Sequence, residues 1–245
     1  MHIKALLPAS VIEYAGHMAD VLYVGACSFR CPYCYNVDLV LRPEQLPDIG
    51  PTQVLRKLEA RRGFVDGLVI TGGEPTLQPD LLAFLADVQQ LGLAVKLDTN
   101  GYRPDVLQGC LERDLLDYVA MDIKSSLARY ELAAGVPIDP KRLQQSIELI
   151  LHSSIDYEFR TTVVPGLVDL QDVQAIVRLI SGARRYYLQC FRPGETVGWG
   201  RDAPVASPSP ELLERMAEIA ACQVQKVGIR GLQASVECVS TSMPY

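Results

Sequence analysis

The chain has 245 residues, of which 49% are hydrophobic and 21% are charged, and its formal net charge is −6. This length suits one α/β barrel-type domain with a buried core. A mildly acidic chain has no general field to attract nucleic acid or anionic lipid, and no run reaches the roughly 18 to 20 apolar residues of a membrane span. Its first residues lack the continuous apolar stretch of a signal peptide. We therefore expect a cytoplasmic protein without a membrane or nucleic-acid partner.

Short apolar runs of strand length recur along the chain and predict β-strands. Six are clear, and a seventh at 223–229 is weaker. The clear runs lie at 20–25, 67–71, 94–98, 117–123, 158–164 and 186–191. They are nearly continuously apolar, as expected for parallel strands that are buried on both faces.

Segments with helical periodicity separate several of these strands, at 80–91, 140–152, 169–180 and 210–222. In the first of them, Leu81, Phe84, Leu85 and Val88 form one apolar stripe, and Gly92 follows as a stop. Strands that alternate with helices predict right-handed βα units on a parallel sheet. We expect a single domain over 1–245, with a barrel at about 18–192 and a short C-terminal extension at about 193–245.

Three of the seven cysteines, Cys27, Cys31 and Cys34, lie in one short segment directly after the first predicted strand. Tightly spaced cysteines in a chain whose thiols stay reduced indicate a metal site rather than disulfides. A closed zinc site and a fully cysteine-ligated 4Fe-4S cluster each need four ligands. Three thiolates would leave one iron of a 4Fe-4S cluster open to a substrate or cofactor.

A zinc site is the alternative interpretation of this motif. Its fourth ligand would be a distant histidine or a scattered cysteine, and the candidates are His2, His17, His152, Cys110, Cys190, Cys222 and Cys238. The four scattered cysteines are most simply interpreted as buried core residues. A non-catalytic zinc or iron–sulfur binding module is therefore one alternative for the whole chain.

A glycine-rich turn, Gly72-Gly73-Glu74, follows the second predicted strand. Two glycines allow a backbone to approach a ligand closely, and the glutamate could pair with an ammonium group. An ordinary tight turn is the commoner meaning of this pattern, so the turn indicates a ligand site only in combination with the other motifs.

Polar residues also end the third and fourth predicted strands. Asp98, Thr99 and Asn100 could reach a ribose or a cation, although an ordinary turn is commoner here too. Asp122 could bind a cation or an amine, and Lys124 could pair with a carboxylate. A helix-capping aspartate and a surface lysine are the alternatives.

Arg160 and Gln189 lie within the fifth and sixth predicted strands. A buried guanidinium needs a partner, so Arg160 either clamps a carboxylate or faces solvent at an edge. All these polar groups lie in or after the carboxyl-terminal halves of successive strands. Because such strand ends converge on one rim of a parallel barrel, the placement predicts one shared site.

These motifs, in this order, resemble the radical SAM superfamily, whose enzymes use S-adenosylmethionine (SAM). The three-cysteine motif is specific to that superfamily, and the segments 34–36, 97–101 and 121–124 resemble its branch of glycyl-radical enzyme activating enzymes. Within this branch the chain is most similar to the activating proteins of anaerobic ribonucleoside-triphosphate reductase, from about residue 14 to residue 191.

The resemblance implies an α/β fold, a partial (β/α)6 barrel with parallel strands. It implies one 4Fe-4S cluster on Cys27, Cys31 and Cys34, with a fourth iron that chelates the amine and carboxylate of SAM. The residues that it places around SAM are Tyr33, Cys34, Tyr35, Gly72, Gly73, Glu74, Thr99, Asn100, Asp122, Lys124, Arg160 and Gln189. It also suggests a monovalent cation near Asp98, Thr99 and Asp122.

The reaction is implied by the resemblance as well. Flavodoxin or ferredoxin reduces the cluster, SAM is cleaved, and the resulting 5′-deoxyadenosyl radical removes a hydrogen atom from one glycine of a partner glycyl-radical enzyme. Two positions depart from the formate-lyase branch, because Tyr35 and Gln189 stand where that branch has histidines. A radical SAM enzyme that acts on a small molecule, a peptide or a nucleic acid is therefore the other alternative.

Overall fold

The framework of the protein is one eight-stranded sheet in which the strands follow one another in chain order. The computed structural model describes residues 1–194 and 206–232. The strands are β1 (Ile3–Ser10), β2 (Ala19–Val24), β3 (Gly67–Gly72), β4 (Ala94–Thr99), β5 (Tyr118–Asp122), β6 (Asp156–Val163), β7 (Tyr186–Cys190) and β8 (Val227–Arg230). Strand β1 is antiparallel to β2, and each later pair of neighbours, from β2–β3 to β7–β8, is parallel.

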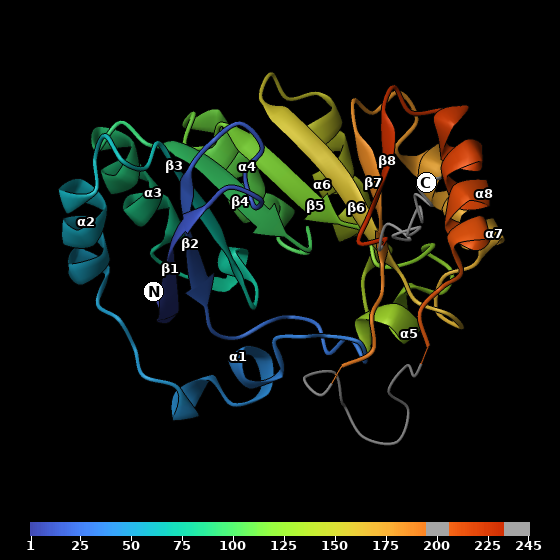
Figure 1. The fold of residues 1–245 in the computed structure, drawn as a ribbon, viewed down its shortest axis with the longest axis horizontal. Helices are drawn as coiled ribbons and strands as arrows, with labels where there is room; N and C mark the ends of the chain where they lie inside the picture. The colour runs from blue at the N-terminus through green and yellow to red at the C-terminus, as the bar shows by residue number, and fades with distance from the viewer. Residues whose placement is uncertain (195–205, 233–245) are drawn as a thin grey trace, which may run out of the picture.

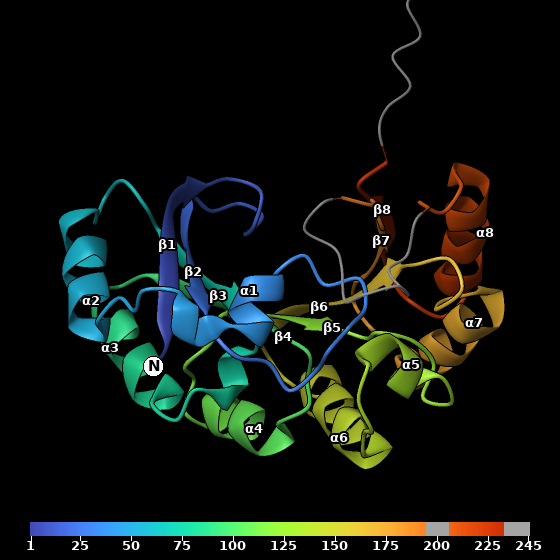
Figure 2. The same cartoon turned by 90° about the horizontal axis from the view of Figure 1, so that it is seen from below.

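Most of the helices lie on the convex face of this curved sheet, and the first one lies at the carboxyl ends of the strands (Figure 1). The helices are α1 (Val37–Leu41), α2 (Pro51–Ala60), α3 (Leu81–Gln90), α4 (Pro104–Glu112), α5 (Tyr130–Ala134), α6 (Pro140–Leu151), α7 (Leu170–Leu179) and α8 (Pro210–Ala221), with short 3-10 turns η1 (Pro43–Gln45) and η2 (Pro75–Leu77). Figure 2 shows the concave face between the β1–β2 hairpin and the β7–β8 pair, with α1 drawn in front of part of it. The edge strands β1 and β8 do not pair, so the sheet forms a partial barrel.

The predicted fold class is confirmed. The six clear apolar runs correspond to β2 to β7, and the weaker seventh overlaps β8. The four predicted helices are α3, α6, α7 and α8. The extension after the sixth predicted strand continues the same architecture, because α8 leads into β8 and β8 pairs with β7. The prediction did not include β1, α2 or α4.

The sequence had suggested that the scattered cysteines are buried core residues. Those that the structure describes do not all lie in the core. Cys110 is buried, Cys190 is partly buried and Cys222 is exposed. Cys222 lies at the C-cap of α8, beyond the buried positions Leu213, Met216 and Ala220. Cys238, and residues 195–205 and 233–245 of the expected C-terminal extension, lie outside the described residues.

The two faces of the sheet bury different kinds of side chain. The main apolar core lies between the strands and the helices, and the stripe of α3 lies entirely within it. The concave face instead carries buried polar groups, including Lys96, Asp98, Glu158 and Arg160. Since side chains alternate along a strand, residues two apart share a face, which brings these groups together inside the partial barrel.

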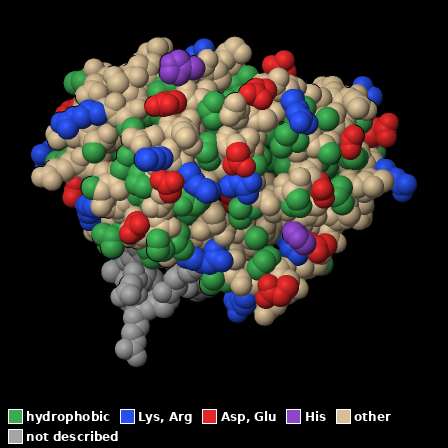
Figure 3. Space-filling view, turned by 180° about the vertical axis from the view of Figure 1, so that it is seen from behind, with side chains coloured by type: hydrophobic (Ala, Val, Ile, Leu, Met, Phe, Trp, Pro, Cys, Tyr) green, Lys and Arg blue, Asp and Glu red, His purple; other side chains and the backbone are tan. Residues whose placement is uncertain are grey.

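The outer surface mixes charges of both signs. Figure 3 shows acidic and basic side chains interspersed with scattered hydrophobic ones on the face that it presents. Among the described helices, none combines the length and the apolar character needed to cross a bilayer.

We predict that Asp20 is needed to hold the edge strand β1. Its fully buried carboxylate accepts hydrogen bonds from the Ala9 backbone N–H at 2.9 Å and from Arg61 Nε and Nη2 at 3.0 and 3.2 Å. The Asp20→Asn substitution removes the charge on which these bonds depend, and we expect it to lower the free energy of unfolding by about 2 kcal/mol in urea denaturation.

The control for this prediction is Asp38→Asn. Asp38 pairs with Arg42 on an exposed helix surface, where both side chains are more than half exposed. Its loss should change the free energy of unfolding by less than about 0.5 kcal/mol. Equal effects of the two substitutions would contradict the role assigned to Asp20.

Candidate active site

The predicted site residues meet around one cavity of about 260 Å³ at the carboxyl ends of the strands. Its lining includes Cys27, Cys31, Tyr33, Cys34, Tyr35, Gly72, Gly73, Glu74, Asp98, Thr99, Asn100, Asp122, Lys124, Arg160 and Gln189. The order of the strands explains this convergence, because the residues come from the ends of adjacent parallel strands.

Hydrogen bonds of Arg30 connect the segment that carries the three cysteines to α5 and to itself. The backbone N–H of Arg30 donates to the carbonyl of Ala134 at 2.7 Å. Its guanidinium turns back and donates to the carbonyls of Cys27 and Phe29 at 2.7 and 2.8 Å. We call residues 27–34 the cysteine loop; these contacts give it a defined shape before any ligand arrives.

The glycine turn at the end of β3 contacts the backbone that leads into the cysteine loop. Gly73 N–H donates to the carbonyl of Val24 at 2.8 Å, and Glu74 N–H donates to that of Ala26 at 2.7 Å. A Cβ atom at Gly73 would lie 1.9 Å from the Ala26 carbonyl oxygen, and one at Gly72, where φ is +114°, would lie 2.5 Å from the Val24 nitrogen. The close approach that requires these glycines is therefore to the chain's own backbone.

Burial keeps the three thiols protonated. It raises the pKa of Cys27 to about 12 and that of Cys31 to about 11, while the positive charge of Lys124 opposes the shift at both. Burial also raises the pKa of Cys34. Because only thiolates bind metal well, a metal centre here would displace protons when it binds.

Glu74 joins the turns that follow β3 and β4. Its Oε1 accepts from the Thr76 backbone N–H at 3.1 Å and from the Thr99 hydroxyl at 2.7 Å, and its Oε2 accepts from the Asn100 N–H at 2.8 Å. Burial raises the pKa of Glu74, against these hydrogen bonds. The carboxylate expected to meet an ammonium group is thus already engaged by the protein.

Arg160 bridges two carboxylates on neighbouring strands. Its Nε lies 2.9 Å from Asp122 and its Nη1 lies 3.1 Å from Asp98. Asp122 also pairs with Lys124 at 3.2 Å, and Asp98 pairs with Lys96 at 3.0 Å. The guanidinium in the fifth predicted strand is therefore buried and paired, not exposed at an edge. This arrangement satisfies buried charges that would otherwise be costly.

Tyr33, in the cysteine loop, and Tyr35, directly after it, differ in their surroundings. Tyr35 is partly exposed, and its hydroxyl donates to the Arg192 carbonyl at 2.8 Å and accepts from the Arg192 N–H at 3.0 Å. Its ring stacks on Phe191 with centroids 6.1 Å apart. Tyr33 is buried, and its hydroxyl has no hydrogen-bond partner among the described residues. Tyr35 therefore ties the loop to the end of β7.

No role was predicted from the sequence for several lining residues, namely Phe29, Asn36, Val40, Thr71 and Thr162. Asn36 has a clear role, because its side-chain amide donates to the Gly72 carbonyl at 3.1 Å. Thr162 lies two residues after Arg160 and so shares its face of β6, and it lies 3.5 Å from Gln189. The alternation along the strand could have identified Thr162.

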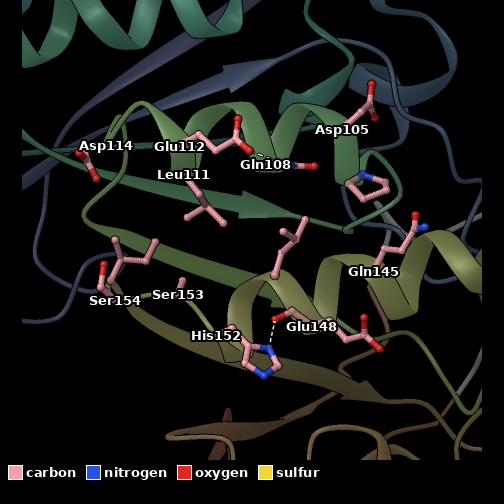
Figure 4. A pocket seen from close by; sticks show the side chains of 13 residues that line it. Asp105, Gln108, Leu111, Glu112, Asp114, Gln145, Glu148, His152, Ser153 and Ser154 are labelled. Atoms are coloured by element: carbon pink, nitrogen blue, oxygen red, sulfur yellow. Dashed lines mark hydrogen bonds between the residues drawn. The ribbon is translucent and has the colours of Figure 1, made fainter.

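A larger cavity of about 770 Å³ lies between α4 and α6 and holds none of these candidates. Figure 4 shows its lining, in which His152 contacts the Glu148 carbonyl at 2.8 Å. The other two histidines are also elsewhere: His2 lies near Asp48 and His17 near Asp66. We assign the site to the smaller cavity, because the thiols and the buried charges converge there.

The donor set of the smaller cavity fits a centre with one open coordination position. Its described lining contains three cysteines and no histidine. In the described residues, no group of three or more His, Cys, Asp or Glu side chains is placed so that it could hold a single metal ion. Three thiolates that each bind a different iron suit a 4Fe-4S cluster with one iron left open.

We predict that Asp122 contributes to stability in a pH-dependent manner. Burial alone would raise its pKa, but Arg160 and Lys124 outweigh burial and lower the pKa from 3.8 to about 2. This contribution is complete above about pH 4 and is lost as the pH falls towards 2. It amounts to about 2 kcal/mol at neutral pH.

The measurement is urea denaturation of wild type and Asp122→Asn from pH 7 down to pH 2. We expect the difference between the two proteins to shrink across the acidic part of this range. Asp87→Asn, on the exposed face of α3, is the control and should follow the wild type throughout. A wild-type advantage that persists at pH 2 would contradict the assignment.

Comparisons with known proteins agree with this geometry. The model of the radical SAM superfamily matches residues 21–180. A Methanocaldococcus jannaschii protein named "Putative glycyl-radical enzyme activating enzyme" is 28% identical over 240 residues, which cover 96% of this chain and 98% of that protein.

Solved structures show the same fold at low sequence identity. Streptococcus suis SuiB bound to S-adenosylmethionine superposes with a TM-score of 0.65 and 13% identity, over 87% of this chain and 52% of that one. A domain of pyruvate-formate lyase-activating enzyme from Bacteroides vulgatus has a TM-score of 0.53 and 18% identity, over 67% of this chain and 99% of that one. The chain therefore belongs to the radical SAM superfamily, and it is a radical SAM enzyme.

Proposed function

We propose that this radical SAM enzyme is an activating enzyme, which generates a glycyl radical on a partner enzyme. The observation that carries the proposal is the match to the Methanocaldococcus jannaschii relative, which spans nearly the whole of both chains. We further propose anaerobic ribonucleoside-triphosphate reductase as the partner, because within this branch the chain is most similar to its activating proteins, from about residue 14 to residue 191.

In this proposal Cys27, Cys31 and Cys34 hold three irons of one 4Fe-4S cluster, and SAM binds at the fourth. When bound, the cluster and SAM supply a one-electron reductive cleavage whose product can remove a hydrogen atom from a glycine α-carbon. The protein's own part is to position these groups. Lys124, partly buried and paired with Asp122, supplies positive charge near the cysteines.

The residues around the rest of the cavity are proposed to bind SAM. Tyr33 and Tyr35 offer aromatic surfaces, and the turn at Gly72 and Gly73 offers backbone groups. Gln189, near the end of β7, offers an amide. Burial in this cavity would strengthen each polar contact with a charged ligand, because the local dielectric is lower than that of water.

A monovalent cation near Asp98, Thr99 and Asp122 stays a prediction. Arg160 already bridges the two carboxylates, so such a cation would have to share them with a guanidinium. Arg160 therefore supplies a positive charge at this position whether or not a cation binds there.

We propose that the substrate is large and that a loop of the partner protein reaches the cavity at the carboxyl ends of the strands. We propose flavodoxin or ferredoxin as the electron donor, and the cytoplasm as the location, because thiols stay reduced there.

The test is anaerobic reconstitution with iron and sulfide, followed by dithionite, SAM and the candidate reductase. We expect 5′-deoxyadenosine and methionine to form, and the reductase to show the electron paramagnetic resonance (EPR) doublet of a glycyl radical. Cys31→Ala should abolish both signals, since two thiolates cannot hold the cluster in an active form. A reductase in which alanine replaces the radical-bearing glycine is the control for the doublet.

Other outcomes would replace the proposal. SAM cleavage without a glycyl radical would favour a small-molecule, peptide or nucleic-acid substrate. A colourless protein that binds zinc and cleaves no SAM would contradict the assigned reaction.

We also predict that Gly73→Ala prevents assembly of the cysteine loop. The new Cβ would meet the Ala26 carbonyl oxygen at 1.9 Å, so the two turns would have to separate. We expect a loss of about 1–3 kcal/mol in stability from the overpacking, and loss of most of the bound iron after reconstitution. The measurement is the iron and sulfide content per chain, together with urea denaturation.

The matched control is Gly50→Ala, at the N-cap of α2. A Cβ there meets nothing within 4 Å, and φ is −65°, which any residue adopts. This variant should bind iron as the wild type does. Full iron content in Gly73→Ala would show that the close contact with Ala26 is dispensable.

A further inference from the structure

The side chain of Asn100 points at a sulfur of the cysteine loop. Its Nδ2 lies 3.7 Å from Cys27 Sγ and 3.0 Å from the hydroxyl oxygen of Ser28. We propose that Asn100 raises the reduction potential of the cluster by donating a hydrogen bond to the Cys27 sulfur. This inference rests on the proposed function only in that Cys27 is taken as a cluster ligand.

The orientation of the amide follows from its neighbours. Asn100 Oδ1 accepts a hydrogen bond from the Tyr102 backbone N–H at 3.0 Å. A backbone N–H can only donate, so the oxygen must face Tyr102 and the NH₂ group must face Cys27. The flipped amide would set two donors against each other at Tyr102, and it would leave Cys27 facing an acceptor.

The position of Asn100 is also fixed through its backbone. Its N–H donates to Glu74 Oε2 at 2.8 Å, and Glu74 is held in turn by Thr76 and Thr99. Asn100 is 4% exposed. The donor is therefore in place before a ligand binds, and little conformational freedom remains to be lost.

A donor at this sulfur changes the energy of reduction. The step is the addition of one electron to the oxidised cluster from a low-potential donor, and no covalent bond forms or breaks. Because reduction makes the cluster and its thiolates more negative, a hydrogen bond to sulfur stabilises the reduced state more than the oxidised one. Exclusion of water from the contact increases this difference.

The hydrogen bond from Asn100 to the Cys27 sulfur can be removed by substitution of the side chain. The Phe29 backbone N–H also donates to Cys27 Sγ, at 3.4 Å. Among the described side chains, Asn100 alone donates a hydrogen bond to any of the three cysteine sulfurs. Its removal should lower the ratio of reduced to oxidised cluster at a fixed potential by about fivefold, as expected for one modest hydrogen bond.

The experiment is a redox titration of anaerobically reconstituted, SAM-free protein, with dithionite as reductant and the EPR signal of the reduced cluster as readout. Asn100→Leu has a similar volume and no donor. At the potential where the wild-type cluster is half reduced, we expect the reduced fraction of the Asn100→Leu cluster to be several-fold smaller. Ser28→Ala is the matched control: it removes the other partner of the same amide and should leave the potential unchanged.

Asn100→Asp is the second variant, because it keeps an acceptor for Tyr102 but has no donor for Cys27. Its potential should be at least as low as that of Asn100→Leu. An unchanged potential in either variant with full iron content would overturn the inference. Loss of the cluster from both would also overturn it, since it would assign Asn100 a structural role. Failure of the wild type to hold a 4Fe-4S cluster would count against the proposed function instead.

Discussion

The site depends on one close contact between two backbones. The turn after β3 passes so near the turn after β2 that only glycine fits at Gly73, against the Ala26 carbonyl. Two hydrogen bonds, to the carbonyls of Val24 and Ala26, fix the separation. Because the cysteine loop begins at the next residue, this contact sets where its thiols lie relative to the ends of the other strands.

Paired charges make up the second layer of the site. Arg160 lies between Asp98 and Asp122, and each carboxylate has a lysine as its other partner. An unpaired ion at this depth would be strongly destabilising, whereas a fully paired network is tolerated. The network therefore places fixed charges around the cavity. Their desolvation takes place when the protein folds, before any ligand binds. A charged ligand that enters the cavity meets this field without large rearrangement.

Glu74 and Asn100 connect the turn after β4 to the turn after β3 and to the cysteine loop. Both were expected to contact SAM, yet the carboxylate of Glu74 is engaged by the turn after β4, and the amide of Asn100 faces Cys27. The Gly-Gly-Glu turn thus supports the cysteine loop from one side and orients a hydrogen-bond donor to it from the other. Their contacts with SAM stay a prediction, and the structure gives both residues a second set of partners within the protein.

Several features could be predicted from the sequence because they are local. The apolar runs of β2 to β7 and the stripe on α3 reflect periodicities of a few residues. Strand β1 escaped notice because it contains Pro8 and is partly exposed at the edge of the sheet, and α2 has only two buried positions, Val54 and Leu58. The convergence of the site residues was also predictable, since adjacent parallel strands end on one rim.

The partner of each polar side chain was decided only in the folded structure. Arg160 finds Asp98 and Asp122 at separations of 62 and 38 residues, and Asn100 finds Cys27 at 73. Such pairs depend on the register of β4, β5 and β6 and on the path of the cysteine loop, which no local pattern encodes. The sequence by itself thus determined which residues meet at the rim. The tertiary structure decided which of them face the cavity and which hold one another, because hydrogen bonds and ion pairs form over a few ångströms and only folding sets distances on that scale.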